Sequence, residues 1–323
     1  MKRKYYLAII ISIGLWLIFP IKGGEKVFGA NFPEKPIKVI VPFGPGAGVD
    51  TEARGIVPYV EKHIGTKVII ENVSGADGKI GLTKVWRAKP DGYTLVIHTT
   101  TMSLIGEALF DPEYRILDFS RIFSWTLFNQ VLVVNSEEWK TLDEFVKTGH
   151  TRPLSVGMPG RGSASHLMGL ILVDGLGIKS NWVPFDGGPQ AITALAGKHI
   201  DFATVATTTA LPLVKAGKLR PLLVLGDQKD YIFPGIPLAK ELGYKFPVIP
   251  AIRGVDGPPQ MGLPIIKIIE GAFAKAIKEH GYITWAQKRM VDIVPLNHEE
   301  YQKAIETQKK EVEKYKGLLR GEK

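Results

Sequence analysis

The chain of 323 residues contains no cysteine. This absence excludes disulfide bonds, thiol catalysis, thiolate metal sites and attachment of a lipid to an N-terminal cysteine. Catalytic motifs are missing too, since neither the zinc-protease pattern H-E-x-x-H nor the nucleophile-elbow pattern G-x-S-x-G occurs. The seven histidines are scattered, and none stands at metal-ligand spacing from a carboxylate. These absences predict a protein that is not an enzyme and has no cofactor, no catalytic residue and no metal site.

Long apolar runs are also absent. The longest, Tyr5–Phe19, is shorter than the roughly 20 residues that span a bilayer comfortably. It follows the basic segment Lys2–Lys4, and residues suited to a cleavage site come after it. This pattern predicts a secretory signal peptide over residues 1–29, cleaved near Gly29 or Ala30. We therefore expect an exported, periplasmic protein, with an uncleaved membrane anchor as the alternative.

Positive charge is in moderate excess. Loss of residues 1–29 would remove five basic residues and one acidic residue, and would lower the formal charge from +9 to +5. Much of the remaining basic character lies in residues 309–323, where acids are interleaved, as on a solvated helix face. Aromatic residues do not alternate with basic ones, so we expect no nucleic-acid partner. A modest positive balance suits an anionic ligand.

Short apolar runs alternate with amphipathic segments after residue 36. This alternation predicts an α/β protein with mainly parallel sheets. Helices are predicted at Asp50–Ile64, from Thr141, at Ser165–Leu176, at Pro264–His280 and at Asn297–Leu319. Strands are predicted at Ile37–Phe43, Lys67–Ile70, Thr94–His98, Gln130–Val134, Leu154–Met158, Asn181–Phe185, Asp201–Val205 and Pro221–Leu225.

A loop of small residues, Gly44–Gly48, leads from the first predicted strand directly into the first predicted helix. Its backbone N–H groups are open to a ligand, and a helix N-terminus attracts anions. Asp50 or Thr51 is expected to cap this helix. The spacing G-x-G-x-G is not the dinucleotide fingerprint, although Glu71 ends the next strand, and no Walker lysine follows. The loop predicts an anion site, with a ligand-free turn as the alternative.

Three further loops follow predicted strands in the same way. Thr99–Thr101 offers hydroxyl groups, whereas Met158–His166 and Phe185–Pro189 consist largely of small residues. In open α/β sheets, ligands bind at the carboxyl ends of the strands. We therefore expect all four loops to share one anion site in a cleft between two lobes, with four independent turns as the alternative.

Four segments are characteristic of a known family, namely Phe32–Phe43, Glu71–Gly78, Pro90–Leu95 and Val214–Arg220. Each segment is a weak signal alone. Their order and spacing, from about Phe32 to about Leu319, resemble the extracytoplasmic solute receptors of the tripartite tricarboxylate transporter type, also called Bug receptors.

The resemblance implies a two-lobed periplasmic binding protein fold, similar to type II, with a mainly parallel sheet in each lobe and a closing cleft. It implies a small carboxylate ligand (a di- or tricarboxylate or an aromatic acid), bound partly by backbone amides and delivered by a monomer to integral membrane transporter subunits. The loops and the resemblance together give these ligand-binding candidates: Gly46, Ala47, Gly48, Asp50, Thr51, Thr100, Thr101, Gly160, Arg161, Gly162, Ser163, Phe185, Gly187 and Asp201.

Three positions depart from the family pattern. Val205 stands where a second acid often follows the one at Asp201, which lowers the expectation of an amino-acid ligand. Arg161 replaces a residue that is commonly small or polar, and it could contact an acidic ligand or lie at the rim. Thr100 stands where glycine is usual, which puts the path of that loop in doubt.

The lobes are expected to share strands. Lobe 1 is placed at residues 30–125 and 228–323, and lobe 2 at residues 126–227. Two other functions stay open, namely a receptor that docks on a membrane signalling protein, and an enzyme that binds a nucleotide or phosphate at the glycine loop.

Overall fold

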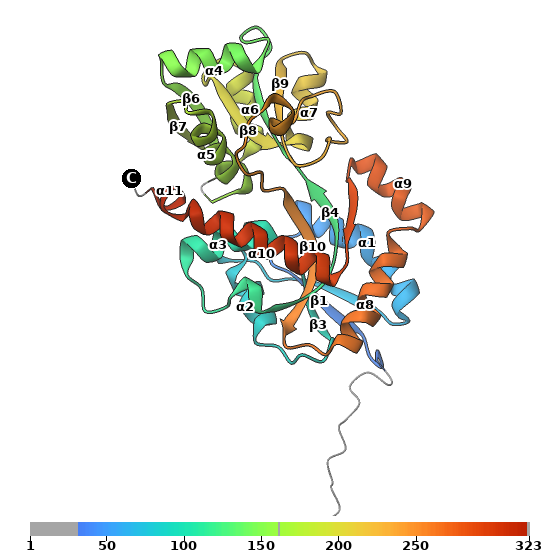
Figure 1. The fold of residues 1–323 in the computed structure, drawn as a ribbon. Coiled ribbons are helices and arrows are strands. Elements are labelled where there is room, and N and C mark those ends of the chain that lie inside the picture. Colours follow the sequence, from blue (N-terminus) through green and yellow to red (C-terminus); the bar gives the residue numbers. More distant parts are fainter. Residues whose placement is uncertain (1–31, 161, 322–323) are drawn as a thin grey trace, which may run out of the picture.

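The computed structural model describes residues 32–160 and 162–321, which form two lobes that each contain a β-sheet covered by helices (Figure 1). The predicted signal peptide lies outside the described residues. None of the helices in these two ranges is both long and apolar enough to cross a membrane.

The sheet of the first lobe has six strands in the order β11-β4-β10-β3-β1-β2. Neighbours β2, β1 and β3 are parallel, whereas β10 is antiparallel to both β3 and β4, and β11 is antiparallel to β4. The strands are β1 (Ile37–Val41), β2 (Val68–Asn72), β3 (Thr94–Thr99), β4 (Phe119–Phe128), β10 (Ala251–Pro259) and β11 (Ile293–Leu296).

The sheet of the second lobe has five strands in the order β7-β6-β8-β5-β9. Here β6 is parallel to β7 and β8, and β5 is antiparallel to β8 and β9. The strands are β5 (Gln130–Asn135), β6 (Leu154–Pro159), β7 (Ser180–Phe185), β8 (Phe202–Ala206) and β9 (Leu219–Leu225).

The α/β fold with a sheet in each lobe is confirmed, but the sheets are mixed and not mainly parallel. The cause is the way in which the chain crosses between the lobes. It leaves the first lobe through β4 and β5, which are joined by Asn129, and it returns through β9, residues 226–250 and β10. An outgoing and a returning strand run in opposite directions, so each sheet gains antiparallel pairs beside its parallel βαβ part.

Eleven α-helices occur in the described part of the chain. Thr141 caps α4, since its hydroxyl accepts the Glu144 N–H, and Asn297 caps α10. The predicted helix Pro264–His280 is interrupted after Ala276 and continues as a separate helix. The helices are α1 (Gly48–Ile64), α2 (Lys79–Trp86), α3 (Thr100–Phe110), α4 (Leu142–Thr151), α5 (Ala164–Leu176), α6 (Gly188–Ala196), α7 (Thr207–Lys215), α8 (Leu263–Ala276), α9 (His280–Arg289), α10 (His298–Lys314) and α11 (Lys316–Arg320).

Apolar packing holds the lobes together. One buried cluster continues from the first lobe into the second and includes Ile105 of α3, Leu172 of α5 and Leu319 of α11. Phe233 and Leu238, which come after the predicted end of lobe 2, are buried against apolar side chains of the second sheet. The exact limits of the lobes stay a prediction.

The carboxyl ends of the parallel strands face the crossing. Thr99, the last residue of β3, pairs with Arg253 of β10, which also pairs with Thr126 near the end of β4. In the other lobe, Ala206 at the end of β8 pairs with Gln130 at the start of β5. Both lobes thus present to the crossing the strand ends at which α/β proteins bind ligands.

Candidate functional site

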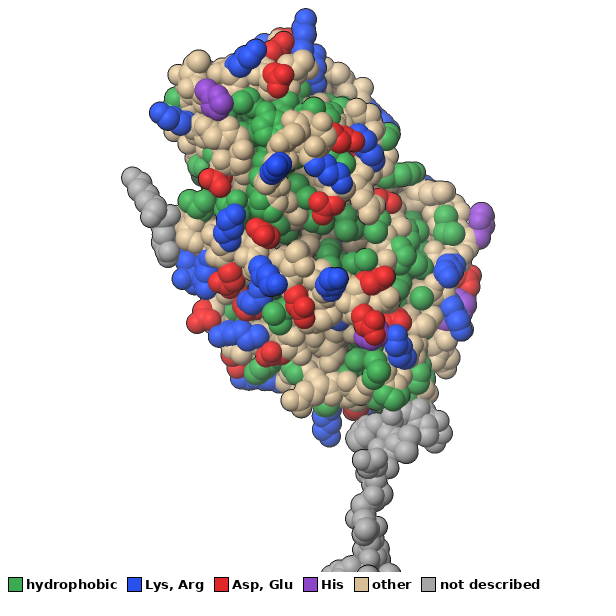
Figure 2. Space-filling model, viewed as in Figure 1, with side chains coloured by type: hydrophobic (Ala, Val, Ile, Leu, Met, Phe, Trp, Pro, Cys, Tyr) green, Lys and Arg blue, Asp and Glu red, His purple; other side chains and the backbone are tan. Residues whose placement is uncertain are grey.

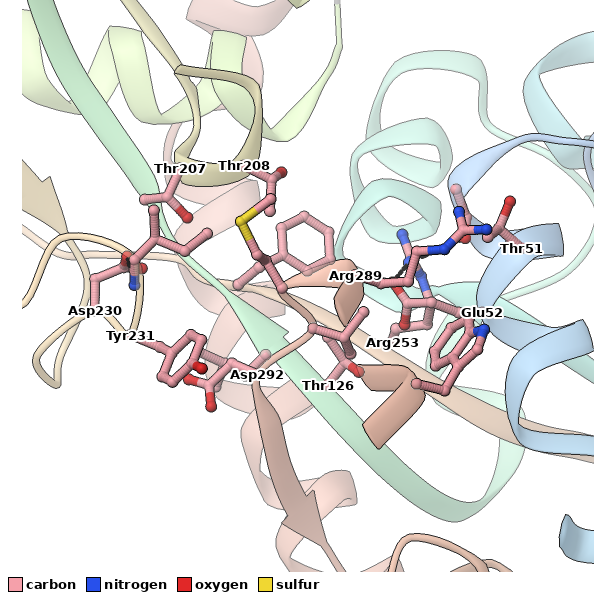
Figure 3. Close-up of a pocket in the computed structure, with 17 residues that line it drawn as sticks. Thr51, Glu52, Thr126, Thr207, Thr208, Asp230, Tyr231, Arg253, Arg289 and Asp292 are labelled. Carbon is pink, nitrogen blue, oxygen red and sulfur yellow. Dashed lines mark hydrogen bonds and ion pairs between the residues drawn. The ribbon is translucent and has the colours of Figure 1, made fainter. Parts of the chain in front are cut away.

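A cavity of about 330 Å³ lies beside the crossing strands and is lined by residues of both lobes (Figure 3). The starts of α1 and α7, the ends of β4 and α9, and the returning connection all contribute to it. Its walls comprise Gly48, Thr51, Glu52, Thr126–Phe128, Thr207, Thr208, Asp230–Ile232, Arg253, Trp285 and Arg289–Asp292.

The glycine loop leaves a set of amides open at the start of α1. The Gly46 N–H donates to Asp50 Oδ2 at 2.9 Å, and the Ala47 N–H donates to the Gly44 carbonyl at 3.2 Å. The amides of Gly48, Val49 and Asp50 have no acceptor in the described part of the chain. First-turn amides lack intrahelical partners, and the helix dipole adds positive potential there. This end of α1 can therefore bind an anion.

Asp50 stabilises the loop from inside. Its buried carboxylate accepts hydrogen bonds from Gly46 N, from Arg54 Nε at 3.0 Å and from Asn72 Nδ2 at 2.9 Å. Burial acts to raise the pKa of Asp50, but these hydrogen bonds and the Arg54 charge outweigh it and lower that pKa below its usual range. Neither Asp50 nor Thr51 caps the helix as expected, because α1 begins at Gly48, with Ala47 at the N-cap position.

Arg253 is held rigidly in the cavity wall. Its Nε and Nη2 donate to Thr99 Oγ1 at 3.2 and 3.1 Å, and its Nη1 bonds Glu52 Oε1. Burial raises the pKa of Glu52, and the Arg253 charge opposes this shift. The Thr126 side chain also opposes this shift as a hydrogen-bond partner of Glu52, and the Glu52 Oε2 and Thr126 Oγ1 atoms are both buried. Glu52, Arg253, Thr99 and Thr126 thus form one buried polar group behind the cavity surface.

Arg289 supplies a second guanidinium group. It lies in the last turn of α9, is exposed, and has no hydrogen bond or ion pair in the portion that the structure describes. Figure 3 shows its side chain extending toward Thr51 at the start of α1. An unpaired arginine beside open helix amides favours a carboxylate, which can accept two parallel N–H bonds.

Two carboxylates line another part of the cavity. Asp230 accepts from Ile232 N at 2.9 Å, Phe233 N at 3.0 Å and Asn129 Nδ2 at 3.1 Å, which fixes it in the returning connection. Asp292 follows α9 and has no hydrogen bond or ion pair within the described ranges. Partial burial and the nearby Asp230 charge raise the pKa of Asp292.

Comparisons with known proteins identify the family of this chain. A family described as "Tripartite tricarboxylate transporter family receptor" matches residues 53–319. The chain belongs to this receptor family. It is also 30% identical over 289 residues to the UPF0065 protein in the gbd 5′ region of Cupriavidus necator, which covers 87% of this chain and 86% of that protein.

Solved structures of related receptors share the fold. A TctC solute-binding protein from Polaromonas superposes with a TM-score of 0.82 at 26% identity, over 90% of this chain and all of that one. MatC from Rhodopseudomonas palustris with bound malate gives a TM-score of 0.68 at 27% identity, over 89% of this chain and 100% of that one. The chain is therefore a solute-binding receptor of the tripartite tricarboxylate transporter type, a family of periplasmic receptors, not of enzymes.

Of the candidates taken from the receptor's sequence, Gly48 and Thr51 line the cavity. Gly46 and Ala47 lie in the same loop, but their amides are used internally. Thr100 and Thr101 are fully buried in the first lobe. The Thr100 hydroxyl bonds the Tyr301 hydroxyl, and Thr101 Oγ1 bonds Gln308 Oε1 at 2.7 Å. These hydroxyls do not reach the cavity, contrary to the expectation that they bind a carboxylate.

The second-lobe loops form their own turns beside the cleft. The N–H of Gly160 donates to the Phe185 carbonyl at 3.0 Å, and Ser163 caps α5 by accepting the His166 N–H. Gly187 occupies the N-cap position of α6. None of these residues lines the cavity, and Arg161 lies outside the described residues.

Asp201 lies at the amino-terminal end of β8, the central strand of the second sheet. It forms a two-point ion pair with Arg152 at 2.7 and 3.1 Å, and accepts the Ser155 N–H at 2.7 Å. This end of the strand is opposite to the one that faces the crossing, and Asp201 does not line the cavity. Val205 is 1% exposed in the apolar core of the second lobe.

The sequence reasoning missed Arg253, Arg289, Asp230 and Asp292. Arg253 is separated from its partner Glu52 by 201 residues, and no local pattern marks either of them. In the sequence, Arg289 looks like any basic residue in the last turn of an exposed helix. Only the three-dimensional arrangement brings these charges to one cavity.

Proposed function

We propose that this receptor captures a small organic carboxylate in the cavity between its lobes and delivers it to integral membrane subunits of a tripartite tricarboxylate-type transporter. The observation that carries the proposal is the set of open amides at Gly48–Asp50, opposite the unpaired Arg289. The bound malate of MatC, a related receptor, agrees with a carboxylate ligand.

The energetics favour a buried anion at this place. Removing a carboxylate from water is costly unless hydrogen bonds replace its hydration. Three first-turn amides, the helix dipole and a guanidinium group supply such replacements without reorganisation. The two antiparallel crossings allow the lobes to close over the ligand through few changes of backbone angle. The closed form is the one that the membrane subunits recognise.

Export and assembly complete the proposal. The receptor is secreted through the signal peptide at residues 1–29, with cleavage near Gly29 or Ala30, and it acts as a periplasmic monomer. On the face shown in Figure 2, acidic and basic side chains are intermixed over both lobes and do not form one large patch of a single sign. This surface suits a soluble shuttle that meets its membrane partner transiently.

A thermal-shift screen with malate, adipate, citrate and benzoate tests the proposal, since a ligand that binds only the folded state raises the melting temperature.

Gly48→Val is the decisive variant. A side chain at Gly48 would enter the cavity and obstruct the open amides, whereas its added Cβ meets nothing closer than Arg253 Nη2 at 3.8 Å, so the fold is kept. We expect the shift given by the best acid to disappear.

Gly271→Val is the matched control, because Gly271 also lies in a helix with no atom within 4 Å of an added Cβ and does not line the cavity. This variant should retain the full ligand-induced shift. Equal shifts in both variants would contradict a carboxylate site at the start of α1. ATP or NAD raising the melting temperature while every organic acid fails would favour the nucleotide-binding alternative.

A further inference from the structure

The cavity carries more negative than positive side chains. Its lining contains three carboxylates, Glu52, Asp230 and Asp292, against two guanidinium groups, Arg253 and Arg289. Glu52 and Arg253 form an ion pair, so each largely cancels the other. Two carboxylates then face a single unpaired arginine and the partial charge of a helix N-terminus, roughly half an elementary charge. A ligand with only negative groups would increase this imbalance.

The charges are also separated in space. Figure 3 shows Arg289 extending toward Thr51 at the start of α1, whereas Asp230 and Asp292 lie together beside Tyr231, away from that helix. Thus one part of the cavity suits an anion and another part suits a cation. A ligand that spans both parts needs groups of opposite sign.

The acidic part has no counter-charge among the described residues. Asp292 has no partner in the described ranges, although it is partly buried next to the Asp230 carboxylate. Asp230, whose exposed fraction is 6%, lines the same cavity, and no basic side chain forms an ion pair with it in these ranges. Two neighbouring carboxylates repel each other, and a cation placed beside them would remove this cost.

We infer that the preferred ligand is zwitterionic, with its carboxylate at the Gly48–Asp50 amides and Arg289, and with a cationic nitrogen beside Asp292 and Asp230. This inference rests on the proposed carboxylate-binding function and narrows it to amino-substituted acids. The sequence analysis disfavoured an amino-acid ligand because Val205 stands where the family often has an acid, but the position of Val205 in the structure does not support that argument. Val205 is buried in the core of the second lobe and does not line the cavity.

Isothermal titration with matched pairs of acids tests the inference on the full receptor. Aspartate and malate differ only in an ammonium group in place of a hydroxyl, and 4-aminobutyrate and glutarate differ only at one end of the same chain. We expect the ammonium member of at least one pair to bind about tenfold more tightly or better, because its cationic nitrogen would form a charge-assisted contact with these carboxylates.

The possible outcomes distinguish a failure of the zwitterion inference from a failure of the proposed function. If malate and glutarate both bind at least as tightly as their ammonium partners, the zwitterion inference is wrong and the carboxylate receptor stands. The same holds if none of the four acids binds while another acid of the wider screen gives a thermal shift. If none of the four acids binds, and the wider acid screen also gives no shift, the proposed function fails as well.

Asp292→Asn tests the cation contact directly. Its side chain makes no hydrogen bond within the described structure, so the isosteric amide should leave the fold intact, as a melting curve can verify. We expect about a tenfold loss of affinity for the ammonium acid and unchanged or tighter binding of its partner. Asp227→Asn is the control, since Asp227 is exposed and lies outside the cavity. Equal effects of Asp292→Asn on both acids would overturn the inference.

Discussion

Asp50 shows how one side chain can hold a glycine loop in place. Its carboxylate accepts hydrogen bonds from three parts of the first lobe: the Gly46 amide of the loop, the Arg54 guanidinium group of α1 and the Asn72 side-chain amide of β2. Gly46 has a φ of +83°, a conformation that glycine adopts without strain. These contacts hold the loop that leads into Gly48, Val49 and Asp50, whose amides have no acceptor in the described part of the chain.

Replacing Asp50 with alanine should therefore affect both stability and binding. The loss of hydrogen bonds to a buried carboxylate is expected to lower the free energy of unfolding by about 1–3 kcal/mol at pH 7, and to weaken binding of the best acid. Because the folded pKa of Asp50 lies below its ordinary value of 3.8, its stabilisation is fully present above that pH and is lost as the pH falls through the folded pKa.

Urea unfolding of the wild type and of Asp50→Ala, at pH 7 and near pH 3, measures both effects. The difference between the two proteins should shrink at the lower pH. Asp227→Ala, at an exposed aspartate, should match the wild type at both pH values. A stability difference at pH 7 no larger than that of Asp227→Ala would show that Asp50 does not hold the loop.

The sequence pointed to part of the cavity lining but could not show the contacts that its residues make. Gly48 and Thr51 were predicted and line the cavity, because a glycine-rich turn before a helix is a local signal. The acceptor for the Gly46 amide, four residues later, could not be seen in a pattern of residue types. Thr100 was predicted as a ligand contact, yet its partner Tyr301 is 201 residues away and draws its hydroxyl into the core.

At the scale of elements, local patterns predicted eight strands, and all eight are present with shifted ends. The three that were missed are β4, β10 and β11. Strand β10 contains Gly254, Gly257 and two prolines, which normally weaken a strand, and it buries Arg253 and Asp256. Their charges are tolerated because each has an ion-pair partner far away in the sequence. Long-range pairing of this kind leaves no local signal.

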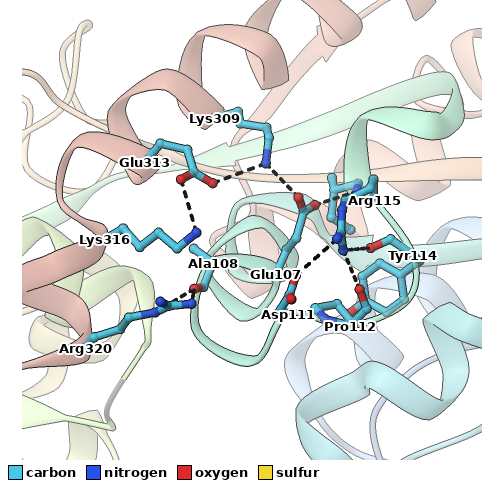
Figure 4. Close-up of polar contacts among 11 residues, drawn as sticks. Glu107, Ala108, Asp111, Pro112, Tyr114, Arg115, Lys309, Glu313, Lys316 and Arg320 are labelled. Atoms are coloured by element: carbon cyan, nitrogen blue, oxygen red, sulfur yellow. Dashed lines mark hydrogen bonds and ion pairs between the residues drawn. The ribbon is translucent and has the colours of Figure 1, made fainter.

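The C-terminal helices connect the two lobes (Figure 4). On the first lobe, Lys309 bonds Glu107 Oε1 at 2.7 Å, and Arg320 Nη2 bonds the Ala108 carbonyl at 2.9 Å, both on α3. Toward the second lobe, Tyr315 Oη contacts Asp174 Oδ2 of α5 at 3.3 Å. The buried Leu319 belongs to the apolar cluster that continues through both lobes. This attachment lies on α3 and α5, whereas the cavity is lined by α1, α7 and α9.

Leu319→Ala should lower the free energy of unfolding by about 2–4 kcal/mol, because it creates a void in a fully buried cluster. Its neighbour Leu318 is 44% exposed, so Leu318→Ala should change stability by no more than about 0.5 kcal/mol. Urea unfolding followed by circular dichroism compares the two variants. Similar losses at both positions would show that α11 does not contribute to the shared core.

At the scale of the whole molecule, two lobes meet along an apolar contact and leave a charged cavity beside the crossing strands. The Gly162 loop of the second lobe approaches the first closely, since a Cβ at Gly162 would lie 2.4 Å from Leu109 Cδ1. The chain passes between the lobes at Asn129 and at the returning connection, so the proposed closure would need backbone changes at these two places and an adjustment of this contact. A ligand shifts the population toward closure only through contacts that the closed form makes better. Groups on both sides of the cavity are placed to provide such contacts.

A crystal structure of the receptor with the acid that gives the largest thermal shift tests the central claim most directly. The account predicts a closed form whose ligand carboxylate lies within hydrogen-bond distance of one or more amides of Gly48, Val49 and Asp50, with Arg289 beside it. A ligand bound between the lobes, with its carboxylate in contact with none of these three amides, would contradict the account.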